Sequence, residues 1–455
     1  MIKPMKQYGE YKDSGIQWIG KIPSHWHAKK IKFSCNVTDG THFSPPTREK
    51  GKLYITVSNV HDDIIDVDNA NRISEDDFLN LVKQGCQPQR GDVLLAKDGT
   101  VGRTAIVKDN DYVVLSSLGI LHPLKGMTSE YLKYSLDSSY LQEQMNAAMA
   151  GSALRRITIN KISEFISIIP PVAEQQSIAS YLDYKVGQID AAIKEKELLL
   201  NDLKTYRSAI ISEAVTKGLD KNAEMKDSSV EWIGKIPKTW KVLKIKQILD
   251  YTSVPLRVGP FGSSLSGNDF KSKGYWVYNQ RVVLDNNFET NDTFISQEKY
   301  DELCSFQVMS GDILLTTRGT IGKVAVVPKS HKEGVLHPCL IKFRVDERVM
   351  NKAFLKYYFN DTDFVLNQVK YNSNSTTIDV IYSYTLKELI ITVPPIGEQT
   401  KIVSYLDKKI SVMDKVLSFI KDDLDDLTSY KSSLITEAVT GKVDLRNWKK
   451  QKEAV

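Results

Sequence analysis

The feature that most constrains the fold is a duplication that runs through the whole chain. "QWIGKIPSHW" from Gln17 and "EWIGKIPKTW" from Glu231 share an unbroken Trp-Ile-Gly-Lys-Ile-Pro string. Three further pairs follow in the same order: "GDVLLAKDGTVGR" from Gly91 with "GDILLTTRGTIGK" from Gly311, "PPVAEQQSIASYLD" from Pro170 with "PPIGEQTKIVSYLD" from Pro394, and "YRSAIISEAVT" from Tyr206 with "YKSSLITEAVT" from Tyr430. Self-similarity of this kind indicates repeated structural units. The chain is therefore expected to form two similar bodies.

Each repeat ends in a segment that predicts a long helix. From Glu174 to Thr216 and from Glu398 to Thr440 there is no Pro, and apolar residues recur at steps of three and four. This spacing is typical of a coiled-coil stripe, and a Pro-Pro pair marks each start. The predicted seam is Leu182, Val186, Ile189, Ile193, Lys196, Leu200, Leu203, Arg207, Ile210 and Ala214, then Leu406, Ile410, Met413, Leu417, Ile420, Leu424, Leu427, Lys431, Leu434 and Ala438. A stripe of this kind needs a partner, and the nearest candidate is the other copy, packed antiparallel.

One equivalent seam position carries a long cation in both copies, Arg207 in the first and Lys431 in the second. Such a side chain can lay its stem along the stripe with its head in water, set the antiparallel register, or meet an acidic group. The sequence leaves these three roles open.

The regions between the helices predict mixed α/β domains. Short apolar runs such as "DVLLA" and "DILLT" are bounded by Gly and Asp, which indicates buried strands with tight turns. The expected fold class is α/β (α+β), with two similar domains separated by two long antiparallel coiled-coil helices in a pseudo-twofold repeat. The expected boundaries are 17–170 for the first domain, 171–216 for the first helix, 217–230 for a linker, 231–394 for the second domain, 395–440 for the second helix and 441–455 for a polar tail.

Composition limits the classes of protein that remain. A chain of 455 residues with 41% hydrophobic and 26% charged residues suits a soluble protein of two domains. No apolar run approaches the ~20 residues that span a bilayer, so we expect no membrane contact and a cytoplasmic location. The first domain has 18 Lys and Arg against 17 Asp and Glu, and the second has 21 against 17. This weak basic excess leaves nucleic-acid binding open without establishing it.

Motifs for chemistry within the chain are absent from the sequence. "GTVGRT" from Gly99 and "GTIGKV" from Gly319 are too short for a phosphate-binding loop and predict tight turns. "HWH" at His25 has no counterpart in the second repeat, which disfavours a metal site. Cys35, Cys86, Cys304 and Cys339 show no Cys-x-x-Cys spacing and are interpreted as ordinary buried thiols. We expect no catalytic residue and no bound metal.

The ordered set of repeated motifs resembles the specificity subunit of Type I restriction-modification enzymes, the HsdS family. The resemblance covers nearly the entire chain. The strings that carry it are "GSALRRITINKISEFISIIPPVAEQQSIASYLD", "VPPIGEQTKIVSYLD", the paired "EAVT" helix ends, the Gly-Asp-x-Leu-Leu block, "VGPFGSSL" from Val258 and "DGTHFSPP" from Asp39.

The resemblance implies a division of labour between this chain and its partners. Each domain would be a target recognition domain that reads one half of a bipartite double-stranded DNA target, and the helices would set the spacer. Two modification subunits would dock on this chain and use S-adenosylmethionine to methylate adenine. Restriction subunits, which are translocases and nucleases, would join with ATP and magnesium. This chain itself would be non-catalytic and would bind no cofactor.

Loop residues of the family-like blocks are the candidate DNA contacts, because Arg, Lys, Asn, Gln, Ser and Thr dominate such contacts. In the first domain they are Thr41, His42, Arg48, Lys50, Asn59, His61, Lys97, Arg103, Arg155 and Arg156. In the second they are Arg257, Ser263, Ser264, Asn279, Gln280, Arg281, Thr317, Arg318 and Lys323. The Lys and Arg side chains are expected mostly on phosphates, with Asn59, Gln280, Arg281 and Arg318 as base readers.

Two other classes of protein fit the same body. A duplicated protein-binding scaffold would show no salt-dependent DNA affinity. A stand-alone DNA-binding regulator would bind its target without modification subunits, although regulators usually obtain twofold symmetry by dimerising.

Overall fold

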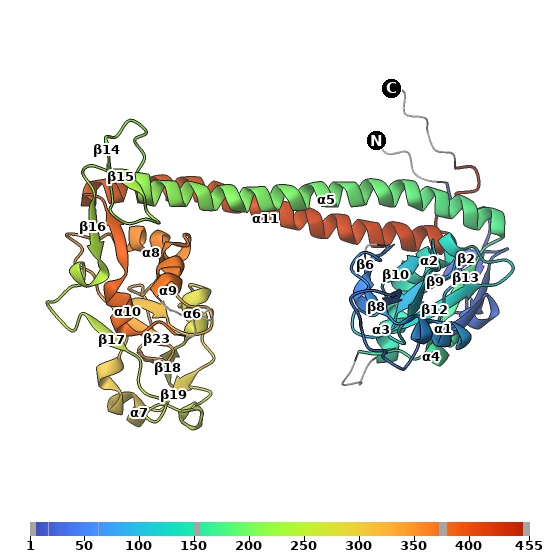
Figure 1. Ribbon diagram of the computed structural model, residues 1–455, viewed down its shortest axis with the longest axis horizontal. Coiled ribbons are helices and arrows are strands. Elements are labelled where there is room, and N and C mark those ends of the chain that lie inside the picture. The colour runs from blue at the N-terminus through green and yellow to red at the C-terminus, as the bar shows by residue number, and fades with distance from the viewer. Residues whose placement is uncertain (1–5, 17, 62, 150–154, 373–379, 449–455) are drawn as a thin grey trace. The chain divides into compact units, whose positions relative to one another are not determined.

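The computed structural model describes residues 6–448 except 17, 62, 150–154 and 373–379. The expected boundary at Gln17, the string "GSAL" and positions 449–455 of the expected tail lie outside the described residues. The chain divides into two compact units (Figure 1). Unit 1 is Met1–Leu198 with Lys421–Val455, and unit 2 is Leu199–Ile420.

Two long helices connect the elements of both units. Helix α5 spans Val172–Lys217 and helix α11 spans Ile396–Val439, so each begins in one unit and ends in the other. None of the described helices is long and apolar enough to cross a membrane.

Unit 1 contains one mixed α/β domain. Its strands are β1 (Tyr11–Asp13), β2 (Lys21–Pro23), β3 (His27–Lys30), β4 (Cys35–Asp39), β5 (Lys52–Ile55), β6 (Val60–His61), β7 (Ile64–Ile65), β8 (Asn71–Ile73), β9 (Val93–Ala96), β10 (Thr104–Ile106), β11 (Tyr112–Val114), β12 (Leu118–Pro123) and β13 (Ile166–Ile169). Its helices are α1 (Glu75–Lys83), α2 (Ser129–Asp137), α3 (Ser139–Met149) and α4 (Ile159–Glu164), with 3₁₀ turns η1 (Ile31–Phe33) and η2 (Val57–Asn59).

Unit 2 contains the second domain. Its strands are β14 (Met225–Asp227), β15 (Lys235–Pro237), β16 (Lys241–Lys244), β17 (Leu256–Val258), β18 (Tyr275–Tyr278), β19 (Phe294–Ile295), β20 (Ile313–Thr316), β21 (Val324–Val326), β22 (Gly334–Leu336), β23 (Leu340–Phe343) and β24 (Ile390–Val393). Its helices are α6 (Gln280–Leu284), α7 (Gln297–Glu302), α8 (Lys352–Asn360), α9 (Phe364–Asn372) and α10 (Ser383–Glu388), with 3₁₀ turns η3 (Ile245–Gln247), η4 (Gly267–Asp269) and η5 (Cys304–Phe306).

The two domains share one sheet topology, which is the structural form of the sequence repeat. A four-stranded antiparallel sheet has the order β10-β9-β12-β4 in unit 1 and β21-β20-β23-β17 in unit 2. A three-stranded sheet has the order β11-β5-β8 in unit 1 and β22-β18-β19 in unit 2, with its first pair parallel. The predicted fold class is confirmed by this pair of mixed α/β domains and the two long helices.

The four-stranded sheet is covered on both faces, which explains its continuous apolar strands. In β9, Val93 and Leu95 pack in the core cluster that contains helix residues such as Tyr131. Leu94 and Ala96 point to the other face and pack with the three-stranded sheet. The run "VLLA" is therefore buried at every position.

Within each unit, α5 and α11 run antiparallel (Figure 1). In unit 1, Asp190 pairs with Lys431 at 2.7 Å and Lys196 with Asp423 at 2.7 Å, so residue numbers rise on α5 as they fall on α11. All predicted seam residues are buried or half-buried.

The equivalent seam cations Arg207 and Lys431 both meet acidic groups. In unit 2, the Arg207 guanidinium lies 3.0 Å from Asp414 of α11 and 2.6 Å from Asp361 at the end of α8. In unit 1, Lys431 pairs with Asp190 of α5. Of the three roles that the sequence left open, the structure therefore shows the meeting with an acidic group.

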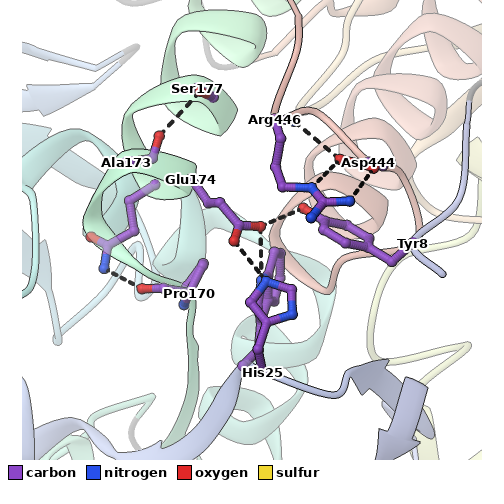
Figure 2. A network of polar contacts seen from close by, with 10 residues as sticks. Tyr8, His25, Pro170, Ala173, Glu174, Ser177, Asp444 and Arg446 are labelled. Atoms are coloured by element: carbon purple, nitrogen blue, oxygen red, sulfur yellow. Dashed lines mark hydrogen bonds and ion pairs between the residues drawn. The ribbon is translucent and has the colours of Figure 1, made fainter. Parts of the chain in front are cut away.

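Segments from both ends of the chain close unit 1 around the first turn of α5 (Figure 2). Glu174 accepts hydrogen bonds from the Tyr8 hydroxyl at 2.8 Å and the Trp26 indole at 3.1 Å, and it lies 2.6 Å from His25 Nε2. Burial, reinforced by the bond to Glu174, raises the pKa of Tyr8 well above its usual value, so the hydroxyl remains a donor. The Arg446 guanidinium lies over the Tyr8 ring, 5.0 Å from its centroid.

The regions expected as linker and tail carry structure. Strand β14 lies within 217–230 and pairs with β15, as β1 pairs with β2 in unit 1, so the second fold begins before Glu231. Positions 441–448 of the expected polar tail pack on unit 1, where Val443 is 7% and Leu445 is 2% exposed. Local polarity suggested a linker and a polar tail, because the residues that these segments pack against are distant in the sequence.

Candidate nucleic-acid interface

In unit 1, several loops emerge at one edge of the four-stranded sheet. The end of β4 pairs with the start of β12, as Asp39 opposes Gly119, and the end of β9 pairs there too, as Ala96 opposes Leu118. The parallel pair β5 and β11 ends at the same place. The amide of Thr41, which follows β4, donates a hydrogen bond to the carbonyl of Val114 at the end of β11. We call this region the first edge.

Unit 2 has the equivalent arrangement. Val258 at the end of β17 opposes Ile341, and Thr316 at the end of β20 opposes Leu340. The parallel pair β18 and β22 also ends here. The amide of His337, which follows β22, donates to the carbonyl of Tyr278 at the end of β18, at 3.0 Å. We call this region the second edge.

At the same point of both edges, a glycine lies directly against the backbone of a neighbouring segment. A Cβ on Gly40 would lie 2.3 Å from the Leu115 carbonyl oxygen, and one on Gly259 would lie 2.1 Å from the His337 carbonyl oxygen. No side chain fits such a backbone crossing. This explains the glycine in "DGTHF" and in "VGPFG", and it fixes where the following loop leaves the sheet.

The turns predicted from the Gly-Thr-x-Gly blocks also lie at these edges. Gly99 and Gly102 have φ of +68° and +97°, and Gly319 and Gly322 have φ of +63° and +78°. These left-handed conformations favour glycine, so the blocks are turns that connect β9 to β10 and β20 to β21.

Most of the predicted DNA contacts lie at the two edges. In unit 1 these are Thr41, His42, Asn59, Lys97, Arg103, Arg155 and Arg156, and in unit 2 they are Ser263, Ser264, Asn279, Gln280, Arg281, Thr317, Arg318 and Lys323. Four others lie elsewhere on their domains. The Arg48 backbone bridges to Arg72 of β8, Lys50 precedes β5, His61 lies on β6, and the Arg257 guanidinium lies over Phe306, 5.6 Å from the ring centroid.

Four of the predicted contacts are buried, and their polar groups are engaged inside the domains. Asn59, expected as a base reader, is 4% exposed and accepts from the Thr56 amide at 3.0 Å. The Lys97 side chain is 2% exposed and pairs with Asp39 at 3.2 Å. The Thr41 and Thr317 hydroxyls donate to the carbonyls of Phe43 and Cys339. These side chains support the edges and are not available to a ligand.

The exposed side chains give the first edge its chemistry. Arg103 and Arg155 are exposed, as is His42, whose Nε2 lies 3.2 Å from Asp39. The Arg156 guanidinium lies 3.1 Å from Asp98. Basic and hydrogen-bonding groups therefore face outward here, as a phosphate backbone and base edges require.

The second edge presents a different set. Arg318 is exposed, while the Gln280 amide donates to the Thr320 carbonyl at 3.2 Å and Lys323 donates to the Asn360 carbonyl at 2.5 Å. Arg281 is 77% exposed and lies 3.4 Å from Asp285.

Arg281 also borders a polar hollow beside α6. The residues that line this hollow are Asn279, Arg281, Val282, Asp285, Asn287, Thr290, Asn291 and Asp292. Asn279 caps α6, since its side chain accepts from the Val282 amide at 3.3 Å.

His337 belongs to the second edge and was not predicted. Burial lowers the pKa of His337, and its Nδ1 accepts from the Cys339 amide at 3.1 Å. The ring is therefore a neutral structural acceptor at physiological pH.

The sequence also missed two acidic residues of the first edge, Asp39 and Asp98. Both hold cations that the sequence had selected, Lys97 and Arg156. A signal was present for Asp98, which occupies the place of Arg318 when the two Gly-Asp-x-Leu-Leu blocks are aligned. Among the described residues, no group of three or more His, Cys, Asp or Glu side chains could hold a metal ion.

The chain contains two copies of one domain, and in each copy the loops gather at the same edge of the four-stranded sheet. It is therefore a tandem-domain protein with one loop surface on each domain. The family model described as "Type I restriction modification DNA specificity domain" matches residues 23–199 and again 237–417. These matches cover most of the chain, and the chain belongs to this family.

Relatives of similar length support the assignment. The chain is 21% identical over 450 residues to the Type I restriction enzyme EcoKI specificity subunit of Escherichia coli K12, covering 93% of this chain and 90% of that protein. It is 21% identical over 439 residues to the putative type I restriction enzyme MjaX specificity subunit of Methanocaldococcus jannaschii, covering 94% and 96%. A solved structure from work on complex assembly and conformational transition of the type I R-M system matches with a TM-score of 0.67 at 15% identity, covering 93% of this chain and 99% of that one. This structural match shows a shared fold.

Proposed function

We propose that this chain is the DNA specificity subunit of a Type I restriction-modification complex, with each domain reading one half of a bipartite target. The observation that carries the proposal is the pair of edges. Their backbone is the same, with equivalent glycine crossings at Gly40 and Gly259, while the side chains that they present differ. A common scaffold with different contact residues suits the reading of two different half-sites.

The chemistry would then belong to partner subunits. Two modification subunits would bring S-adenosylmethionine and methylate adenine, and restriction subunits would bring ATP and magnesium. The chain would be non-catalytic, and the complex would act in the cytoplasm, where it meets DNA. The long helices would set the spacer between half-sites and carry the modification subunits.

An exposed apolar stripe on α11 supports partner docking. Val412, Val416 and Phe419 follow one another at helical spacing and are 61%, 40% and 70% exposed. We call them the α11 stripe. The equivalent positions of α5 are Gln188, Ala192 and Glu195. Because apolar stripes of this kind usually pack against another helix, an amphipathic helix of a modification subunit is a fitting occupant.

The stripe gives the first prediction. Phe419→Asp places a charge where a partner helix would pack, so we expect modification-subunit affinity to fall by about 10-fold or more. Gln188→Asp, at the α5 position equivalent to Val412 of the stripe, is the control and should leave the affinity unchanged. Co-purification and titration of the modification subunit measure both. Equal affinities for the two variants would contradict docking on the stripe.

The proposed function is tested by mapping methyl-adenine in a naive genome by long-read sequencing. The chain is expressed with and without its modification subunit. A single split motif that appears only when both are present is expected, and it would reveal both half-sites. A well-formed complex that adds no methylation would overturn the proposal in favour of a scaffold. Tight, specific DNA binding by the chain alone would favour a regulator.

A further inference from the structure

Each edge contains one isolated backbone bridge in which one residue is an arginine. The arginine lies on one segment of the bridge in unit 1 and on the opposite segment in unit 2. In unit 1 the bridge joins Asp98 to Arg156, and in unit 2 it joins Arg318 to Val380. The hydrogen bonds beside them match as well. The Ile157 amide donates to Lys97, and the Ile381 amide donates to Thr317, each at 2.9 Å. The two corners are therefore structurally equivalent, but the arginine of the bridge lies on a different segment in each.

The arginine of unit 1 forms an ion pair with a carboxylate, whereas no such pair is seen for the arginine of unit 2 among the described residues. Arg156 Nε lies 3.1 Å from Asp98 Oδ1, and the two side chains are 49% and 28% exposed. Because this contact uses Nε, the terminal amino groups of Arg156 remain available as donors. Arg318 is exposed, and across the part of the chain that the structure describes no carboxylate pairs with it.

We propose that Arg156 reads a guanine in the first half-site, that Asp98 is its positioning residue, and that Arg318 contacts a backbone phosphate. This inference rests on the proposed function. Recognition of guanine O6 and N7 needs a planar guanidinium fork held in the plane of the base. A carboxylate that fixes the fork beforehand lowers the conformational entropy lost on binding. An unheld arginine still attracts phosphate through its charge, which carries no sequence information.

The assignment differs from the sequence-based expectation, which selected Arg318 as a base reader. Both arginines carry the same charge and belong to the equivalent bridge, although they lie on its opposite segments. The turn position of the bridge distinguishes the two copies, because it is Asp98 in the first and Arg318 in the second.

The experiment compares methylation motifs written by complexes that contain Arg156→Ala, Arg156→Lys, Asp98→Asn or Arg318→Ala. For both Arg156 variants we expect one guanine of a single half-site to become degenerate, with discrimination there falling about 5- to 150-fold, which corresponds to the ~1–3 kcal/mol of a bidentate base contact. Asp98→Asn should relax the same position, and Asp98→Glu should restore it. A purely structural role for Asp98 would not alter one motif position alone.

Arg318→Ala is the matched control from the equivalent corner. It should keep every motif position, lower the extent of methylation, and reduce the slope of log affinity against log salt by about 1. Arg156→Lys and Asp98→Asn keep the test decisive if Arg156→Ala does not fold, which co-purification with the modification subunits reports.

The outcomes separate this inference from the proposed function. If the wild-type chain writes no split motif, the proposed function fails. If the wild type writes a split motif but the Arg156 variants keep all its positions, or the affected half-site lacks guanine, the inference is overturned. Relaxation of a motif position by Arg318→Ala would also overturn it, since the two roles would be reversed.

Discussion

Lys97 shows how a side chain that was selected for its charge can belong to the interior. It is 2% exposed, and its ammonium lies 3.2 Å from Asp39 at the end of β4. The other Asp39 oxygen lies 3.2 Å from the exposed His42 ring. In unit 2 the equivalent corner holds Thr317, whose hydroxyl bonds to a backbone carbonyl. One corner thus holds an ion pair, and the other holds a hydroxyl that is hydrogen-bonded to the backbone.

Removal of the lysine should therefore destabilise unit 1. Lys97→Met leaves the Asp39 carboxylate largely buried without its cation, a loss that costs about 3 kcal/mol for such pairs. Asp39→Asn in the same chain should recover much of that free energy, because no buried charge is then left unpaired. Hydrogen exchange of β4 and β12 amides measures the effect within unit 1. Lys108→Met, at an exposed position, is the control, and equal exchange in both variants would contradict the prediction.

Most candidates that were selected by residue type and turn position lie at the two sheet edges, but residue type and turn position did not predict burial. Asn59 and Thr317 carry the same groups as exposed base readers, yet each is 4% exposed and bonded internally. The difference depends on which distant backbone approaches the side chain. For Thr317 this is Cys339, across the sheet. A single sequence does not reveal such long-range contacts.

At the scale of elements, local patterns were sufficient to predict the two long helices and the most apolar strands. The steps of three and four gave α5 and α11, and the short apolar runs gave β9 and β20, because each pattern is set by the burial of the element itself. The order of strands in the sheets could not be read in the same way. Neighbours such as β4 and β12 are distant in sequence, and no local pattern encodes their pairing.

A duplicated ion cluster joins two elements in each unit. Glu164 at the end of α4 accepts from Lys30 and Lys32, and Glu388 at the end of α10 accepts from Lys244 and Lys246. These hydrogen bonds lower the pKa of each glutamate from 4.5 to about 2. The same ion cluster therefore joins the end of a helix to strand β3 in unit 1 and to strand β16 in unit 2. We call this cluster the latch.

The latch predicts a pH dependence. Because the folded pKa lies below the unfolded value, its stabilising contribution is complete above about pH 4.5 and is lost as the pH falls toward 2. The double variant Glu164→Gln, Glu388→Gln should have a slightly lower thermal midpoint at neutral pH and a smaller fall in midpoint below pH 4.5 than the wild type. High salt should narrow the difference, since both glutamates are exposed. Superimposable midpoint curves would disprove a stabilising role.

At the scale of the whole molecule, the segments near the two ends of the chain pack together in unit 1 in the way that the linker segment packs in unit 2. The Asp444 amide donates to the Lys6 carbonyl at 2.7 Å, and the Tyr11 hydroxyl donates to the Gly441 carbonyl at 3.1 Å. In both units a glycine after the long helix packs against the Trp of the repeated motif, Gly441 on Trp26 and Gly218 on Trp240. In each unit, the segment that follows the long helix therefore packs against the Trp of the repeated motif and closes that unit.

This closure predicts that unit 1 depends on the C-terminal segment. Leu445 is 2% exposed in the unit 1 core, so Leu445→Ala should lower the free energy of unfolding of unit 1 by about 2–5 kcal/mol. Leu219, in the connector of unit 2, is 41% exposed, and Leu219→Ala should change stability by no more than about 0.5 kcal/mol. Hydrogen exchange separates the units, with β2 and β12 amides reporting on unit 1 and β15 and β23 amides on unit 2. Faster exchange in unit 1 alone is expected for Leu445→Ala. Equal acceleration in both units would mean that the C-terminal segment stabilises the molecule as a whole, and no acceleration would mean that unit 1 closes without it.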